Sequence, residues 1–187
     1  MCFHRSGLLV VSTPYIGMDT VKAAYYINNC AGRGKGVFSS RRFIPGEFIL
    51  QFRGEQVHFR DIPDFTHYIQ ISPDYFLGPS GEADDFVNHS CEPNSAVSLE
   101  QGNLVLRALR NIGKGREIVF DYGTILFSEP TSFQCDCGSK QCRGIIGNFY
   151  TLPPDLQCFY LERNMVPLLT YKTACGIPAQ MAEVSLA

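Results

Sequence analysis

Short apolar runs separated by glycine and proline dominate the middle of the chain. Such runs, bounded by turn-forming residues, are typical of short β-strands. They lie at residues 36–38, 48–52, 67–71, 75–77, 96–99, 104–109 and 118–120. The segment 101–103, Gln-Gly-Asn, separates two of these runs and predicts a hairpin turn, and 111–115 predicts a second reversal. We therefore predict a mainly β fold.

Helical spacing of apolar residues appears only late in the chain. Apolar and long side chains recur there at Leu156, Phe159, Tyr160 and Arg163. The preceding segment 153–155, Pro-Pro-Asp, is typical of a helix start. We expect a C-terminal helix here and a frayed tail after Cys175. Residues 18–26 fit either a short helix or a strand, and the sequence leaves that choice open.

Length and charge narrow the class of protein. With 187 residues and 45% hydrophobic content, the chain can bury one core of good size, and a second independent domain would not fit beside it. The net charge of −2 gives no basic surplus of the kind that drives non-specific nucleic-acid binding, so no direct nucleic-acid partner is expected. The stretch 7–16 is too polar for a signal peptide or a membrane span, which predicts an intracellular protein of nucleus or cytoplasm.

Three of the eight cysteines crowd into a Cys-x-Cys-x4-Cys cluster formed by Cys135, Cys137 and Cys142. One tight loop can aim three thiolates at a common point, and a structural zinc ion takes four ligands. Cys91 is the best candidate for the fourth ligand. The alternatives are Cys2, Cys30, Cys158 and Cys175. Buried free thiols or a local disulfide would be the other interpretation, but such crowding serves no packing purpose. Four thiolates leave no open position, so we expect the zinc to be structural.

Three further segments could carry chemistry. The segment 34–36, Gly-Lys-Gly, could let the backbone approach a ligand because glycine lacks a Cβ, although alone it is more often an ordinary loop. The segment 88–94, Asn-His-Ser-Cys-Glu-Pro-Asn, concentrates polar groups, and we interpret it as a site rather than a self-bonded turn. Tyr122 ends an apolar strand, where a tyrosine usually anchors packing. Patterns of hydrolases and nucleotide-binding enzymes are missing from the sequence.

Taken in order, these segments resemble the SET-domain protein-lysine methyltransferases with a post-SET zinc motif, of a compact, stand-alone type. The resemblance rests on 34–38, 52–55, 88–94, 117–122 and the cysteine cluster. It implies a fold of small curled sheets in which the Asn-His and Asp-Tyr segments cross in a knot-like arrangement. The boundaries that we expect are an N-terminal extension at 1–29, a SET domain at 30–128, a post-SET zinc loop at 129–148, and a C-terminal helix and tail at 149–187.

The resemblance also implies roles for single residues, with S-adenosylmethionine as methyl donor. The residues expected at the donor are Gly34, Lys35, Gly36, Tyr68, Asn88 and His89. The catalytic site would contain Tyr122 as the catalytic tyrosine, with Phe120, Phe52 and Tyr68 as aromatic walls of a lysine channel. Cys91 matches the family's fourth zinc ligand, so the predicted metal ligands are Cys91, Cys135, Cys137 and Cys142.

The predicted function is methyl transfer to the ε-amine of a lysine in a protein, such as a histone tail. Phe52 and Asp85 depart from the tyrosine and arginine that the family often has, which bears on the substrate more than on the reaction. Phe120 has no hydroxyl to hold a water molecule, which predicts di- or trimethyl-lysine as product. The alternative is a catalytically silent peptide-binding module. The acidic residues Glu82, Asp84 and Asp85 are expected to form a solvated loop.

Overall fold

The computed structural model describes residues 24–30, 32–127 and 132–168. Within these residues the strands form four small sheets. The largest sheet has the strand order β1 (Tyr25–Cys30), β2 (Gly34–Ser39), β10 (Glu117–Phe120) and β7 (Asn88–His89). Two three-stranded sheets have the orders β3 (Phe48–Gln51), β9 (Asn103–Ala108), β8 (Ser95–Glu100) and β4 (Gln56–His58), β6 (Tyr75–Leu77), β5 (Ile69–Gln70). The smallest sheet pairs β11 (Phe133–Gln134) with β12 (Ile145–Ile146).

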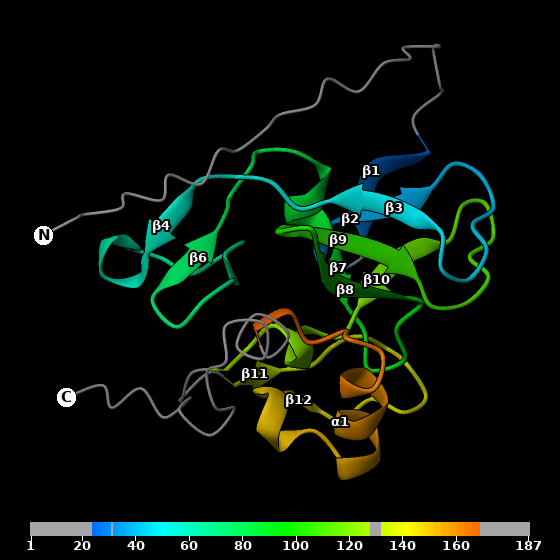
Figure 1. Cartoon of the computed structure of the whole chain (residues 1–187). Coiled ribbons are helices and arrows are strands. Elements are labelled where there is room, and N and C mark those ends of the chain that lie inside the picture. The colour runs from blue at the N-terminus through cyan, green and yellow to red at the C-terminus, as the bar shows by residue number, and fades with distance from the viewer. Residues whose placement is uncertain (1–23, 31, 128–131, 169–187) are drawn as a thin grey trace, which may run out of the picture.

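The helical elements are short. They are the 3₁₀ turns η1 (Phe59–Asp61), η2 (Ala83–Phe86), η3 (Tyr122–Thr124) and η4 (Phe149–Thr151), and the α-helix α1 (Pro154–Leu161). In Figure 1, the sheets that contain β1, β2, β3 and β7 to β10 lie together, and the sheet with β4 and β6 stands to one side of them. The β11–β12 pair and α1 form a third part below both. Among the described residues, no helix combines the length and the apolar character that a membrane span requires.

Most of the strands follow the apolar runs of the sequence. Every predicted run contains a strand, although the run at 67–71 is a strand only at Ile69–Gln70 because His67 has a positive φ of 65°. The predicted hairpin turn is confirmed: Gln101 and Gly102 have φ of 49° and 80°, and β8 pairs with β9 on either side. The predicted C-terminal helix is confirmed as α1, with proline in its first turn.

The open choice at 18–26 is settled in part. Residues 25 and 26 belong to β1, whereas 18–23 lie outside the described residues, as does the tail after Cys175. The sequence did not predict β4, β7, β11 and β12, which have two or three residues each. Strands this short carry no period of their own and are defined by the partner they pair with.

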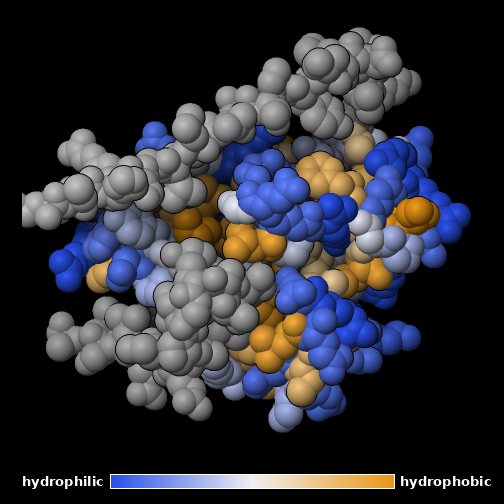
Figure 2. Space-filling view, viewed as in Figure 1, coloured by the Kyte–Doolittle hydropathy of each residue, from blue (hydrophilic) through white to orange (hydrophobic). Residues whose placement is uncertain are grey.

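Among the described residues, two larger hydrophobic cores support the fold, beside a small cluster of Cys91, Cys135 and Ile146. The main core packs between the larger sheets and contains Val37, Phe43, Leu106, Ile118 and Phe120 among other buried residues. A second core lies beneath α1 and is formed by Phe127, Phe149, Leu152, Tyr160, Val166 and Leu168. Figure 2 shows that the hydrophobic surface on the visible face gathers mainly toward its middle, with hydrophilic residues around it. The C-terminal segment therefore packs through a core of its own.

The segment 88–94 and the strand β10 lie side by side. β7 pairs with β10 in parallel, with Asn88 opposite Val119. Beyond this pair, the backbone N–H of Ser90 donates to the carbonyl of Phe120 at 3.0 Å, and the side chain of Asn94 donates to the carbonyl of Glu117 at 2.7 Å. This pairing brings the end of β10 close to Cys91, the residue that follows Ser90.

Candidate active site and metal centre

Tyr122 lies at the start of η3, two residues after the end of β10. Its backbone N–H and its hydroxyl are both bonded to residues in or just before β7. Its backbone N–H donates to Nδ1 of His89 at 3.1 Å, and its hydroxyl donates to the carbonyl of Val87 at 2.8 Å. Burial, with a smaller contribution from Glu117, raises the pKa of Tyr122 to about 12. The hydroxyl therefore stays neutral near pH 7, and because its hydrogen is bound to Val87, it offers only lone pairs to a substrate.

The predicted aromatic walls are brought together in part. The ring of Phe120 lies 4.9 Å from that of Tyr122 and 5.9 Å from that of Phe52, measured between centroids. Phe52 and Phe120 are 5% and 2% exposed. Tyr68 lines a hollow of about 430 Å³ whose wall also contains Arg53, the residue that follows Phe52. Three predicted residues thus make one aromatic wall, and Tyr68 belongs to the space beside it.

The predicted donor residues of β2 face a polar cluster. Asn88 donates from Nδ2 to the carbonyl of Lys35 and to Oε1 of Glu117, both at 2.9 Å. Arg33 pairs with the same carboxylate at 2.7 Å. A Cβ at position 36 would lie 2.5 Å from Sγ of Cys30, 2.8 Å from Oε1 of Glu117 and 2.9 Å from Nδ2 of Asn88, so any larger residue would displace these side chains.

Sequence reasoning missed Arg33, Glu117 and the thiol of Cys30 in this cluster. Cys30 donates to Glu117 at 3.2 Å. The available signal was Glu117 itself, a carboxylate at the start of an otherwise apolar strand, which needs a partner when that strand is buried. Gly34 and Lys35 are exposed at the same end of β2. The glycines, Lys35 and Asn88 therefore do meet, whereas His89 turns away from them.

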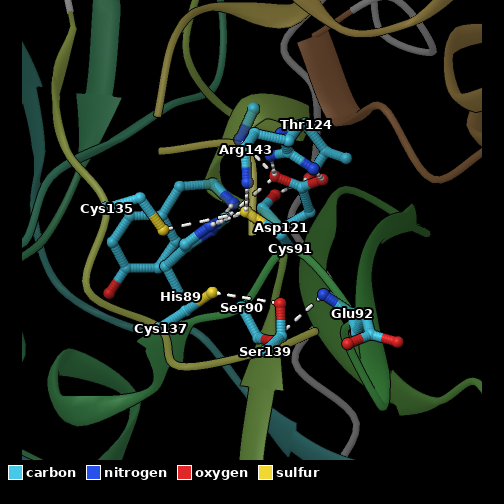
Figure 3. Close-up of polar contacts among 12 residues, drawn as sticks. His89, Ser90, Cys91, Glu92, Asp121, Thr124, Cys135, Cys137, Ser139 and Arg143 are labelled. Atoms are coloured by element: carbon cyan, nitrogen blue, oxygen red, sulfur yellow. Dashed lines mark hydrogen bonds and ion pairs between the residues drawn. The ribbon is translucent and has the colours of Figure 1, made fainter. Parts of the chain in front are cut away.

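The sulfur cluster lies on the other side of Tyr122. One ligand atom each from His89, Cys91, Cys135 and Cys137 falls within 4.8 Å of the others. The Sγ atoms of Cys91 and Cys135 are 3.7 Å apart, and Nε2 of His89 is 3.3 Å from Sγ of Cys91 (Figure 3). Thiolates are donors that zinc prefers, so the three thiols fit three of the four positions of a structural zinc ion.

His89 is a poor metal ligand in this arrangement. Burial lowers the pKa of His89 to about 4, which keeps the ring neutral near pH 7. Its Nδ1 accepts the N–H of Tyr122, so the ring hydrogen is assigned to Nε2, which points at the sulfur of Cys91. A protonated ring nitrogen has no lone pair for a metal. His89 is thus better suited to donate to a bound thiolate than to take a coordination position.

The fourth ligand position is left to Cys142 or another cysteine. Sγ of Cys142 lies 3.5 Å from the carbonyl oxygen of Cys135, at the border of the cluster. Of the alternatives, Cys30 donates a hydrogen bond to Glu117, and Cys158 is exposed on α1. Cys2 and Cys175 lie outside the described residues. The set of four cysteines stays a prediction.

Within the cluster, Cys137 is the thiol that ionises most readily. Burial raises its pKa, but hydrogen bonds at Cys91 and Ser139 outweigh burial, and the pKa falls to about 6. The thiolate is the form that binds metal. Burial raises the pKa of Cys91. Its sulfur accepts the backbone N–H of Arg143 at 3.4 Å.

The acidic residues before β7 do not form a solvated loop, and that expectation is wrong for two of them. Asp84 is buried and accepts the backbone N–H of Arg53 at 2.8 Å. Asp85 accepts the N–H groups of Ser80 and Gly81 at 3.0 and 2.7 Å. Asp85 therefore fixes the backbone of its own turn, whereas Asp84 ties that turn to the distant Arg53. Of the three acidic residues, only Glu82 is exposed. Acidic composition alone does not reveal that nearby N–H groups need acceptors.

Comparison with known protein families adds the decisive observation. Residues 34–123 match the family profile described as SET domain. The chain contains a SET domain. The matched SET segment begins at the glycine of β2 and ends one residue after Tyr122, so it spans the donor cluster and the aromatic wall. The mainly β fold of small sheets with a C-terminal helix is confirmed as a SET-domain fold.

Curated relatives of this SET domain are histone-lysine N-methyltransferases. Histone-lysine N-methyltransferase 2B of Homo sapiens is 30% identical over 140 residues, which cover 66% of this chain and 5% of the relative. Histone-lysine N-methyltransferase ash1 of Drosophila melanogaster is 34% identical over 133 residues, covering 63% and 6%. An H3 lysine-36 specific histone-lysine N-methyltransferase of Mycosarcoma maydis is 35% identical over 155 residues, covering 78% and 15%. The chain thus spans a small part of each relative's length.

A solved structure shares the fold. The crystal structure of KRYPTONITE in complex with mCHG DNA and SAH matches with a TM-score of 0.58 and 25% sequence identity. The match covers 67% of this chain and 29% of that chain. The SET-domain core is therefore common to both, and most of the KRYPTONITE chain has no counterpart in this match.

Proposed function

We propose that this SET domain transfers a methyl group from S-adenosylmethionine to the ε-amine of a lysine in a protein. The observation that carries the proposal is the position of Tyr122, a neutral hydroxyl bound at 2.8 Å to Val87 and flanked by Phe120. Its lone pairs can orient an amine or a polarised methyl group without taking a proton.

A structural neighbour supports the choice of donor. SAH, which is bound in the KRYPTONITE structure, is the product left when S-adenosylmethionine gives up its methyl group. In this chain we propose that the donor lies beside the exposed glycine end of β2, between Asn88 and Tyr68. Gly34, Lys35, Gly36 and the backbone of His89 would complete this site.

The chemistry requires a neutral lysine rather than a strong base. Deprotonating a free lysine at pH 7 costs about 4.6 kcal/mol, since its pKa is ~10.4 and each unit corresponds to ~1.36 kcal/mol. The described acids near Tyr122 are already paired, Glu117 with Arg33 and Asp121 with Arg143. An apolar channel lined by Phe52 and Phe120 would lower the amine's pKa by removing water.

The reaction then balances without a protein base. The lone pair of the lysine nitrogen attacks the donor methyl group, the carbon–sulfur bond breaks, and its electron pair stays on sulfur. The proton that the lysine lost beforehand has gone to water. The protein's contribution is alignment and exclusion of water, and alignment of this kind can supply roughly 7–11 kcal/mol.

The proposed zinc is structural. Cys91, Cys135, Cys137 and Cys142 would hold it, and it would supply a cross-link between the segment 88–94 and the post-SET loop. Because Cys91 stands two residues from His89, which accepts the N–H of Tyr122, such a link would also fix the tyrosine. Metal binding and the shape of the active site are then coupled.

Substrate and product follow from the same site. We propose a histone tail as substrate, in the nucleus, because the relatives are named for histones. The DNA bound by KRYPTONITE concerns that protein, and the net charge of −2 favours a protein partner here.

Phe120 has no hydroxyl, so we propose di- or trimethyl-lysine as end product. Phe120→Tyr should shift the product ratio towards monomethyl-lysine, with Phe48→Tyr as a surface control; a wild type that stops at monomethyl-lysine contradicts this.

The deciding experiment is to incubate the protein with isotopically labelled S-adenosylmethionine, histone octamers and a cell extract, and to locate the label by mass spectrometry. Label on lysine that disappears with Tyr122→Phe supports the proposal. Calorimetric binding of S-adenosylhomocysteine without any transfer would instead indicate the silent binding module. Neither binding nor transfer would exclude both functions.

A further inference from the structure

Asp121, the residue directly before Tyr122, is a fully buried carboxylate with partners from three separate segments. Its side chain is 0% exposed and pairs with Arg143 through two bonds, Nη1 to Oδ2 at 2.9 Å and Nη2 to Oδ1 at 2.7 Å. The hydroxyl of Tyr160 on α1 donates to Oδ2 at 3.3 Å. The N–H of Gly123 donates to Oδ1 at 3.0 Å, so the carboxylate also caps the turn that carries Tyr122.

Arg143 touches the metal cluster as well as Asp121. It follows Cys142 directly, and its backbone N–H lies 3.4 Å from Sγ of Cys91. Figure 3 shows the guanidinium of Arg143 against the carboxylate of Asp121, beside the sulfur atoms. The backbone of one residue thus contacts a predicted metal ligand while its side chain holds the carboxylate next to Tyr122.

The two contacts depend on each other. Both contacts belong to one residue at the end of the loop 135–142, so an opening of that loop that moved the backbone of Arg143 away from Cys91 would also break its pair with Asp121. If that loop opens, Asp121 becomes a buried charge without its cation, which is strongly unfavourable. The remaining donors, Gly123 and Tyr160, are neutral and do not replace the lost charge. The end of β10 must then rearrange until water reaches the carboxylate.

We infer that Arg143 is a positioning residue that transmits the folded state of the metal loop to Tyr122 through Asp121. Loss of the metal therefore loosens the turn at Tyr122 even though Tyr122 makes no bond to the metal cluster through its side chain. The inference rests on the proposed function only in treating Tyr122 as catalytic. The coupling itself can be measured on the protein without any substrate.

The primary test is amide hydrogen exchange at Tyr122, Gly123 and Thr124, followed by mass spectrometry or NMR, with zinc content measured in parallel. Removing zinc from the wild type with a chelator should speed exchange at these amides by about tenfold or more, since their acceptors are His89 and Asp121. Amides that stay protected in the metal-free wild type overturn the inference without need of any variant.

The second test separates Arg143 from the metal itself. Arg143→Gln, kept at full zinc occupancy, should exchange at these amides about as fast as the metal-free wild type, and Arg143→Lys should lie between the two. Arg107→Gln is the matched control, because Arg107 makes an equally bidentate pair with Glu100, at 2.6 and 2.7 Å, on the surface. If protection of Arg143→Gln returns fully once zinc is restored, Arg143 acts only by retaining the metal and the inference fails.

A double variant tests the pair even if Arg143→Gln alone destabilises the protein. Adding Asp121→Asn to Arg143→Gln removes the unpaired charge, so the two effects on unfolding should be non-additive, with the double variant more stable than their sum predicts. Additive effects overturn the pairing argument. Absence of methyl transfer by the wild type would refute the proposed function and leave these exchange results valid.

Discussion

Around Asp121, three segments far apart in the sequence meet through buried polar groups, whereas the β4–β6–β5 sheet is held together by aromatic rings that stay half exposed. His58 of β4 packs edge to face on Tyr75 of β6 at 5.3 Å, and Phe65, from the loop before β5, packs in the same way on Phe76 of β6 at 5.1 Å. Phe65 and Tyr75 remain 51% and 46% exposed. Within the described part of the chain, no buried side-chain nitrogen or oxygen lacks a partner.

The difference indicates which of the two regions can change its conformation. A fully bonded polar cluster loses much if one partner moves, so it fixes its groups in one arrangement. Aromatic rings at the surface can shift and still contact a partner, and they offer large apolar area. Under the proposed function, we expect the region around Asp121 to align the reacting groups and the β4–β6–β5 sheet to contact the substrate protein.

The largest effect should follow from breaking the metal cluster. Cys137→Ser removes the thiol that ionises most readily, so zinc content should fall and turnover should drop by roughly a hundredfold or more. Zinc content is measured by mass spectrometry of the metal and turnover with labelled donor. Cys158→Ser, an exposed thiol on α1, is the control and should behave as wild type. Full activity in zinc-free protein would show that the cysteines do not shape the active site.

The next effect concerns Tyr122 itself. Tyr122→Phe removes one oxygen and should lower kcat by about a hundredfold while changing donor affinity by less than about threefold. The carbonyl of Val87 loses its partner, which costs ~1–3 kcal/mol of stability. Enzyme kinetics and calorimetry with S-adenosylhomocysteine measure the two effects, and Tyr150→Phe, at an exposed tyrosine, is the control. Near-normal turnover in a folded variant would exclude the assignment.

Alkaline pH tests the burial of the same hydroxyl. The folded pKa of Tyr122 is raised to about 12 from an ordinary value of 10.0. Between those values the unfolded chain loses the proton first, so the free energy of unfolding should fall as pH rises, by roughly 2–3 kcal/mol in total. Urea unfolding from pH 9.5 to 11.5 should therefore show a shallower pH slope for Tyr122→Phe. Equal slopes would mean that the hydroxyl is not buried from solvent.

The smallest effect should come from the aromatic sheet. Phe65→Ala removes an exposed ring, and we expect KM for a histone substrate to rise by about three- to tenfold with kcat nearly unchanged. Phe48→Ala, at a ring of similar exposure on β3, is the matched control. A fall in kcat with KM unchanged would reverse the assignment of the two regions.

The sequence predicted those parts of the fold that carry their own pattern. β8 and β9 are apolar runs on either side of the turn at Gln101 and Gly102, and α1 begins at a proline pair. β7, with two residues, could not be predicted because its strand character comes from pairing with β10. The cysteine cluster was evident because closely spaced thiols in one loop are typical of a metal site.

Asp121 shows why the rest of the site was missed. In the sequence it stands between two residues that were singled out, and an aspartate after a strand looks like an ordinary turn residue. Its partners lie 22 and 39 residues further along the chain, at Arg143 and Tyr160. Nothing in the local pattern reveals such distant contacts. The solvated interpretation of Asp84 failed for the same reason, because its donor is the backbone of Arg53.

The second hydrophobic core shows that the segment matched by the family profile is shorter than the part of the chain that packs together. The family match ends at residue 123, yet Phe127, Phe149 and Tyr160 pack together beyond it, and Tyr160 reaches back to Asp121. A transplant of residues 34–123 alone into another protein would remove this second core and leave Asp121 short of two donors. A protein fused to residues 34–123 must therefore bury the surface that the second core covers here. Otherwise the transplanted segment should extend through residue 168.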